Sequence, residues 1–201
     1  MKKITTKGQT LLEVLIAISI LVVALVTTIA LIVASIKAGR ESTNKLIGTS
    51  LAREAVELAR NIRDSNWAAT ATLDWDSGLT SGTDNTATLV VDGTNPLSLN
   101  FSDNGFTVIK QSGAEYLQGA SASGNDTQFY RLVYLNPICR KDSDGDEQIV
   151  AVGVDEDCAS FGTGTDYAKV GIRVVAEVRW PSSSSTKHVT IEDRLYNWQV
   201  L

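Results

Sequence analysis

Glu13 is a carboxylate at the edge of a long apolar segment. From Val14 to Ile36 the sequence has no charged residue, and its only polar side chains are the hydroxyl groups of Ser19, Thr27, Thr28 and Ser35. A segment of this length can cross the hydrocarbon core of a membrane, which takes roughly 20 residues of helix. A carboxylate near lipid is unfavourable unless another group neutralises it, so we expect Glu13 to find a partner outside its own segment. The alternative is that Glu13 only reaches the lipid headgroups from a helix end.

Two cysteines, Cys139 and Cys158, enclose an acidic segment far downstream of the apolar one. An even cysteine count in an exported domain favours one disulfide, and a pair of free, buried thiols is the alternative. Closing this loop would stabilise the fold by roughly 3 kcal/mol in the chain-entropy model.

The same segment contains three alternating carboxylates, Asp142, Asp144 and Asp146, around Gly145. Carboxylates at this spacing begin many calcium loops, because Ca²⁺ takes six to eight oxygen ligands. The further match to an EF-hand fails, since Glu147 stands at the required glycine position and Gly153 at the closing glutamate position. We favour a solvated acidic turn and keep the three aspartates as candidate Ca²⁺ ligands.

Signals for catalysis and for nucleic-acid binding are poor. His188 is the only histidine and lies in a predicted strand, and the chain has no G-x-S-x-G nucleophile motif. The net charge of −5 becomes more negative without the three lysines of residues 1–8, so the bulk surface lacks the basic face that phosphate binding needs. We expect neither an enzyme nor direct contact with nucleic acid.

The flanking charges predict how the apolar segment is oriented. Lys2, Lys3 and Lys7 precede it, which favours an N-terminus in the cytoplasm and a chain that continues outside after Ile36. A secretory signal peptide cleaved near Ala34 or Ala38 is the competing interpretation, but the length of the segment and Glu13 count against it.

The stretch KGQTLLEVLIAISILVVALV resembles the N-terminus of a type IV prepilin: a short basic leader, a glycine, a glutamate at a fixed spacing and about twenty apolar residues. The resemblance implies that prepilin peptidase cleaves between Gly8 and Gln9 and methylates the new amine of Gln9. Glu13 would then be the fifth residue of the mature chain. Members of the family usually have Phe where this chain has Gln9. The resemblance covers about a fifth of the chain.

Electrostatics gives a reason for this arrangement. A helix that begins near Gln9 places a charged amine and the Glu13 carboxylate in adjacent turns close to the membrane surface. In a staggered array of parallel helices, Glu13 of one subunit can meet the Gln9 amine of its neighbour, which forms a charge pair in low dielectric.

Beyond the membrane the helix is expected to continue to about residue 64. An apolar face recurs at helical spacing, through Ile47, Leu51, Ala55, Leu58 and Ile62. The charged residues on the other side, which are Arg53, Glu54, Glu57, Arg60 and Arg63, are expected to form a solvated face. Gly39 and Gly48 are the expected weak points of the helix.

From Ala68 onward the apolar pattern changes to period 2, which predicts strands. They are expected over residues 70–75, 86–92, 97–101, 106–110, 127–136, 148–153, 168–180 and 187–198. The last two form a predicted hairpin around the Pro-Ser connection. We therefore predict an α+β, pilin-like fold: residues 1–8 are a leader, 9–36 and 37–66 are the membrane and amphipathic halves of one helix, and 67–201 are a head with an antiparallel sheet.

Two functions from different classes follow. The first is a minor pilin or type II secretion pseudopilin that spans the inner membrane once and enters a pilus or pseudopilus. Its expected partners are other pilin subunits, prepilin peptidase and the inner-membrane assembly platform. The second is a membrane-anchored extracytoplasmic binding module or enzyme, for which residues 9–36 would be only an anchor.

Overall fold

The computed structural model describes residues 7–69, 74–80, 86–91, 98–102, 105–119, 121–141, 143–150, 158, 167–182 and 185–198, without the side chains of residues 7–10. The chain forms two compact units, Met1–Asn44 and Lys45–Leu201. Helix α1, Lys7–Ala68, contributes to both units. It begins two residues before the predicted start near Gln9 and ends four residues after the predicted end near residue 64.

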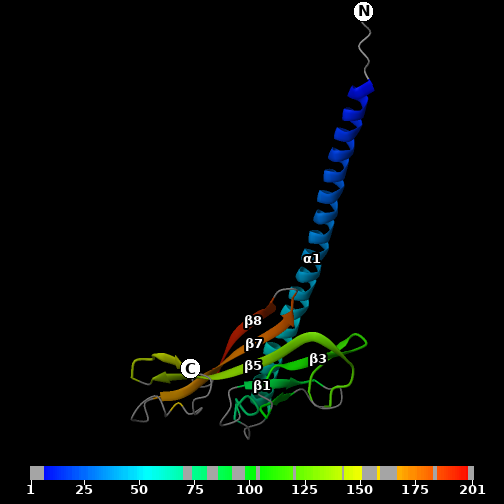
Figure 1. Ribbon diagram of the computed structural model, residues 1–201. Coiled ribbons are helices and arrows are strands. Elements are labelled where there is room, and N and C mark those ends of the chain that lie inside the picture. Colours follow the sequence, from blue (N-terminus) through cyan, green and yellow to red (C-terminus); the bar gives the residue numbers. More distant parts are fainter. Residues whose placement is uncertain are drawn as a thin grey trace, which may run out of the picture. The chain divides into compact units, whose positions relative to one another are not determined.

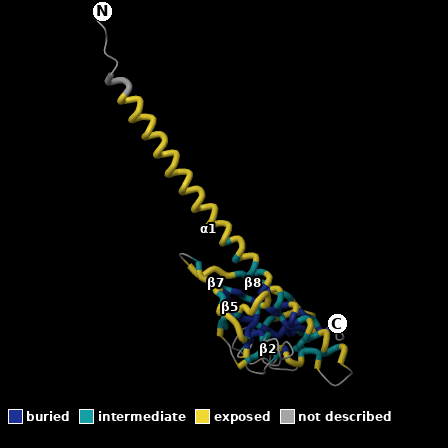
Figure 2. Tube along the Cα trace, turned by 90° about the vertical axis from the view of Figure 1, so that its right-hand side faces the viewer, coloured by how far each residue is buried: buried dark blue, intermediate teal, exposed yellow. Residues whose placement is uncertain are grey.

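The first unit consists of the N-terminal part of α1. Residues 11–40 are all exposed, as the yellow part of the helix in Figure 2 shows. Its hydroxyl groups bond to the helix itself: Ser19 donates to the Leu15 carbonyl and Thr28 to the Ala24 carbonyl, each at 2.7 Å. Such bonds satisfy polar side chains without water. Within the described ranges, α1 is the one helix long and apolar enough to be a candidate membrane span.

The second unit combines the C-terminal part of α1 with an eight-stranded antiparallel sheet, which confirms the predicted α+β fold. The strands are β1 (Thr86–Val90), β2 (Ser98–Asn100), β3 (Thr107–Ser112), β4 (Glu115–Leu117), β5 (Asn125–Lys141), β6 (Glu147–Ile149), β7 (Tyr167–Pro181) and β8 (Thr186–Tyr196).

The long strand β5 organises the sheet (Figure 1). It pairs with β1, β3, β6 and β7, while β2, β4 and β8 add to β1, β3 and β7 respectively. A break in register between Ile138 and Cys139 marks a bulge in the β5–β7 ladder. Every strand pairing is antiparallel.

The core lies between one face of the sheet and one face of α1. The helix buries Leu51, Ala55 and Leu58 as predicted, with Ile47 and Ile62 partly buried beside them. The sheet contributes alternate residues, which in β7 are Ile172, Val174, Ala176, Val178 and Trp180. The alternation in the sequence therefore identified the buried face of this strand correctly.

The predicted strand boundaries hold best in the terminal hairpin, where β7 and β8 pair from Gly171 with Tyr196 to Pro181 with Thr186. One strand was missed, and one predicted strand was wrong where the structure describes it. Strand β4 was missed, because three residues are too few to show a period. In the predicted strand 70–75, residues 70–73 lie outside the described residues, and Asp74 and Trp75 belong to no strand. Trp75 nevertheless packs against the core from a turn.

Candidate functional site

The three residues of the predicted processing and assembly motif all lie near the start of α1. Gly8 and Gln9 are helical, and the side chain of Gln9 is outside the described part of the structure. Glu13 is exposed, and within the described part of the chain it has no hydrogen bond or ion pair. Its carboxylate is therefore available to a partner from another molecule.

The apolar side chains that follow Glu13 are uncovered on every side of the helix. The large aliphatic residues between Leu11 and Ile36 have exposed fractions from 46% at Val33 to 71% at Leu31. An apolar surface of this extent needs lipid or other helices to cover it. This segment can therefore insert into a membrane, pack against copies of itself, or do both.

Arg131 joins the sheet to the second part of α1. It lies in β5 and is completely buried. Its Nη1 donates to the Leu51 carbonyl at 2.9 Å and to the Glu54 carboxylate at 2.7 Å, and its Nε donates to Gln118 Oε1 at 2.7 Å. The helix and the sheet thus share one buried guanidinium, whose directional bonds fix where they meet.

Burial makes the Arg131 cation expensive to hold. Desolvation lowers the pKa of Arg131, and the nearby Glu54 carboxylate opposes that shift. The amide nitrogen of Gln118 donates to the carbonyl of Arg131 at 3.2 Å, so the same glutamine binds both the side chain and the backbone of the arginine. The sequence carries a signal for this site, although we did not predict it: Arg131 alternates with Phe129 and Val133, which are both buried.

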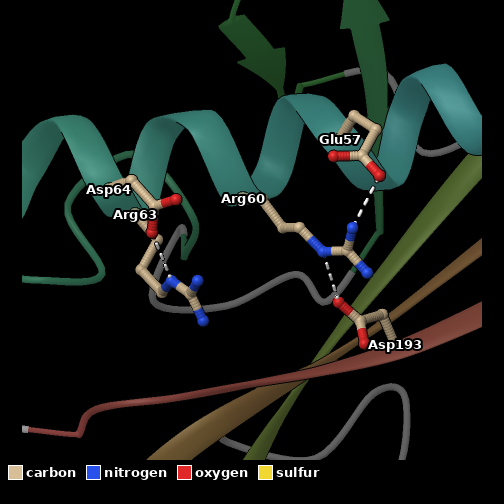
Figure 3. A network of polar contacts seen from close by, with 5 residues as sticks. All are labelled: Glu57, Arg60, Arg63, Asp64 and Asp193. Carbon is tan, nitrogen blue, oxygen red and sulfur yellow. Dashed lines mark hydrogen bonds and ion pairs between the residues drawn. The ribbon is translucent and has the colours of Figure 1, made fainter.

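A second group of charges connects α1 to β8 (Figure 3). Arg60 donates to the Asp193 carboxylate at 2.9 Å and to the Glu57 carboxylate at 2.6 Å. The hydrogen bond to Asp193 raises the pKa of Arg60. Arg63 pairs with its neighbour Asp64 at 2.9 Å.

These contacts correct the expectation of a wholly solvated charged face. Glu54 and Arg60 hold the helix to the sheet, whereas Arg53 and Glu57 are exposed as predicted. Arg63 is partly covered, and its guanidinium carbon lies 4.5 Å from the centre of the Trp67 ring.

Gly48 is a point of close approach between α1 and the sheet. A Cβ atom added there would lie 2.9 Å from Cζ3 of Trp180. Gly48 therefore admits the indole ring, and the expectation that it is a weak point of the helix stays a prediction. At Gly39 an added Cβ would meet no atom within 4 Å.

Cys139 and Cys158 form the predicted disulfide, with a Cα–Cα distance of 5.5 Å. Both cysteines are buried, in a small apolar cluster with Val150 and Tyr167. This cluster is separate from the main core.

The acidic segment next to this disulfide forms a turn between β5 and β6. Asp142 lies outside the described residues. The Asp144 carboxylate accepts a hydrogen bond from the backbone of Asp146 at 3.1 Å and lies 3.5 Å from Lys141 Nζ. The bond from Asp146 lowers the pKa of Asp144. Within the described ranges no group of three His, Cys, Asp or Glu residues could hold a metal ion, and Ca²⁺ binding stays a prediction.

His188 lies in β8 opposite Arg179 of β7 and is exposed, at an ordinary strand position.

Comparison of the chain with known protein families, with curated proteins and with solved structures finds no match. The observations thus define a class by architecture alone: an α+β protein with one disulfide and one candidate membrane span near its N-terminus.

Proposed function

We propose that this chain is a structural subunit of the type IV pilin kind, a minor pilin or a pseudopilin, which assembles through the apolar part of α1. The observation that carries the proposal is the exposed apolar helix with one unpaired carboxylate, Glu13, near its start. A simple membrane anchor has no use for that carboxylate, because its burial in lipid only costs free energy.

The proposed mechanism is assembly itself. Prepilin peptidase removes residues 1–8 and leaves Gln9 as the new N-terminus. In the membrane the apolar helices lie parallel, and the Glu13 carboxylate attracts the Gln9 amine of the next subunit. Pairing two charges in low dielectric favours one axial offset between neighbouring helices, and apolar packing along residues 14–36 then holds them together.

The contacts of the second unit suit a subunit that must carry load between its helix and its sheet. Arg131 binds α1 at two places, Leu51 and Glu54, and Arg60 adds a third contact through Asp193. A tethered module would need only a linker between its anchor and its folded part. Here the helix that contains the apolar segment is also a core element of the sheet domain.

The topology of the proposal follows from the flanking lysines: the N-terminus is cytoplasmic, and the disulfide domain is outside. The disulfide between Cys139 and Cys158 is consistent with an oxidising exterior. The partners are then other pilin subunits, prepilin peptidase and the inner-membrane assembly platform.

Glu13→Ala tests the proposal, and Glu57→Ala is its matched control in the same helix. Both positions are exposed, and only Glu13 belongs to the apolar segment. In the native cell we expect Glu13→Ala to abolish incorporation into sheared fibres or pseudopili and Glu57→Ala to leave it unchanged. The Cys139–Cys158 disulfide should form in both variants, which shows that the head still folds.

N-terminal peptide mass spectrometry of the membrane fraction provides a second, independent readout. We expect the wild-type chain to start at Gln9, with one added methyl group on its amine. A chain that starts at Met1 or beyond Ile36, or normal incorporation of the Glu13→Ala variant, would refute the proposal and leave a tethered or secreted module.

A further inference from the structure

Among the described strands, β8 leaves one long edge of the sheet without a partner. It pairs with β7 along its whole length and, among the described strands, with no other. Figure 1 shows it as the outermost strand beside β7. It has 11 residues, whereas β2, β4 and β6 have 3 residues each. A long edge is a template for another strand, and natural sheets usually keep their edges short for that reason.

The two faces of β8 differ in character. Val189 and Ile191 lie opposite Val178 and Ala176 of β7 and pack against the core. The other face carries His188, Thr190, Glu192 and Arg194, all of them exposed. A strand added to this edge would continue both faces, so its side chains must match each of them.

We propose that β8 pairs antiparallel with β8 of a second copy of this chain, with the two-fold axis at Thr190. In an antiparallel ladder, the backbone N–H and C=O groups of two directly opposite residues either both point toward the partner strand or both point away from it. The two kinds of pair alternate along the strand. A strand that pairs with its own copy therefore has its axis at a residue and never between two residues. This limits the possible registers to a few.

The register centred on Thr190 is complementary at the three positions on each side of the axis. It places Lys187 opposite Asp193, His188 opposite Glu192 and Val189 opposite Ile191. Each of these pairs occurs twice because of the two-fold axis. Asp193 also accepts a hydrogen bond from Arg60 of its own chain at 2.9 Å. Opposite charges and apolar pairs directly across a ladder are stabilising, and like charges are not.

The neighbouring registers lack this match. An axis at Ile191 sets His188 against Arg194 and Val189 against Asp193. An axis at Glu192 sets that carboxylate against its own copy, and an axis at Val189 sets Lys187 against Ile191. Charge complementarity therefore selects both the occupant of the edge and its register.

A two-fold contact closes on itself, because both copies use the same surface. It links chains in pairs and does not lengthen a fibre, whose neighbours meet through unlike surfaces. The pairing is thus distinct from assembly through α1, and it does not depend on the function proposed above. It would join copies that are not consecutive subunits of one fibre.

Site-specific cross-linking of the full-length protein in detergent tests this register. In Thr190→Cys the two new thiols face each other across the axis, at the Cα separation of a cross-strand pair, which suits a disulfide. Thr186→Cys is the matched control: the same substitution on the same strand, also exposed. In the proposed register its two copies lie about 27 Å apart along the ladder, far too distant to be bridged.

Mild oxidation should therefore give a dimer for Thr190→Cys and none for Thr186→Cys, with the linking peptide identified by mass spectrometry. Both variants keep α1, so association through that helix would raise both yields equally. Equal yields, or no dimer from Thr190→Cys, would overturn the proposal. The charges of β8 would then serve to protect the edge from pairing.

Charge reversal gives a second test in the Thr190→Cys background. Glu192→Lys removes both His188–Glu192 pairs across the ladder and should lower the dimer yield about 2- to 30-fold. Adding His188→Glu should restore it, because a carboxylate and an ammonium group then lie opposite each other across the ladder. Glu192 also pairs with Arg173 of its own chain at 2.6 Å, and both variants lose that contact. A failure of the rescue would place the effect in that ion pair and refute the register.

Discussion

Residues 11–36 and residues 45–68 belong to the same helix, but the first segment exposes its apolar side chains and the second buries them on one face. In the first segment every large aliphatic side chain is exposed. In the second, one face is buried against the sheet, and Glu54 and Arg60 bind groups of the sheet. The sequence difference behind this is the amphipathic period, which the first segment lacks. The second segment is stabilised by its own chain, and the first can be stabilised only by lipid or other molecules.

This contrast has a measurable consequence. Substitutions in the contacts of the second segment should lower the free energy of unfolding of the head, and Glu13→Ala should not.

The largest effect is expected at Arg131. Arg131→Met leaves Gln118 Oε1 without its buried donor and removes the charged hydrogen bond to Glu54, whereas the Leu51 carbonyl keeps its bond within the helix. The unsatisfied buried acceptor costs about 1–3 kcal/mol and the lost charged hydrogen bond about 1.5–3 kcal/mol, so we expect a total loss of about 4 kcal/mol.

Arg60→Met is the matched control for that prediction. The Arg60 side chain is 40% exposed, and surface ion pairs contribute at most about 1 kcal/mol. Urea unfolding of the full-length chain in detergent, followed by tryptophan fluorescence, measures both variants. Equal losses for the two would show that Arg131 is held no more tightly than a surface arginine.

The disulfide should have the next largest effect. Replacing both cysteines by alanine removes a link over a sequence separation of 19 residues, which is worth about 3 kcal/mol. The same urea titration should show this loss. A reducing agent should lower the unfolding midpoint of the wild-type chain and leave that of the double variant unchanged. If the reductant shifts neither midpoint, the link contributes nothing to the stability of the head.

Features that depend on a local period could be predicted from the sequence, and features that depend on a distant partner could not. The apolar face of α1 and the buried face of β7 repeat at the spacing of their elements, so the sequence identified them. Arg131 could be assigned to a strand, but its bonds to Leu51 and Glu54 connect residues about 80 positions apart in the chain. The disulfide was an exception, because two cysteines permit only one intramolecular pairing.

The two helix glycines show the same limit and give the smallest predicted effect. Sequence alone makes Gly39 and Gly48 equivalent, since glycine weakens a helix wherever it occurs. The surroundings separate them: a methyl group at Gly48 would lie 2.9 Å from Trp180, and one at Gly39 would meet nothing within 4 Å. Gly48→Ala should destabilise the head by about 1–3 kcal/mol through overpacking, less the gain in helix propensity. Gly39→Ala should leave the stability of the head unchanged, since any gain of up to about 1 kcal/mol acts on the helix alone. Urea unfolding measures the change in the free energy of unfolding for each variant. A loss at Gly48 and no change at Gly39 would show that only Gly48 serves the packing of the head. A stabilising Gly48→Ala would mean that the Trp180 indole can move aside without cost.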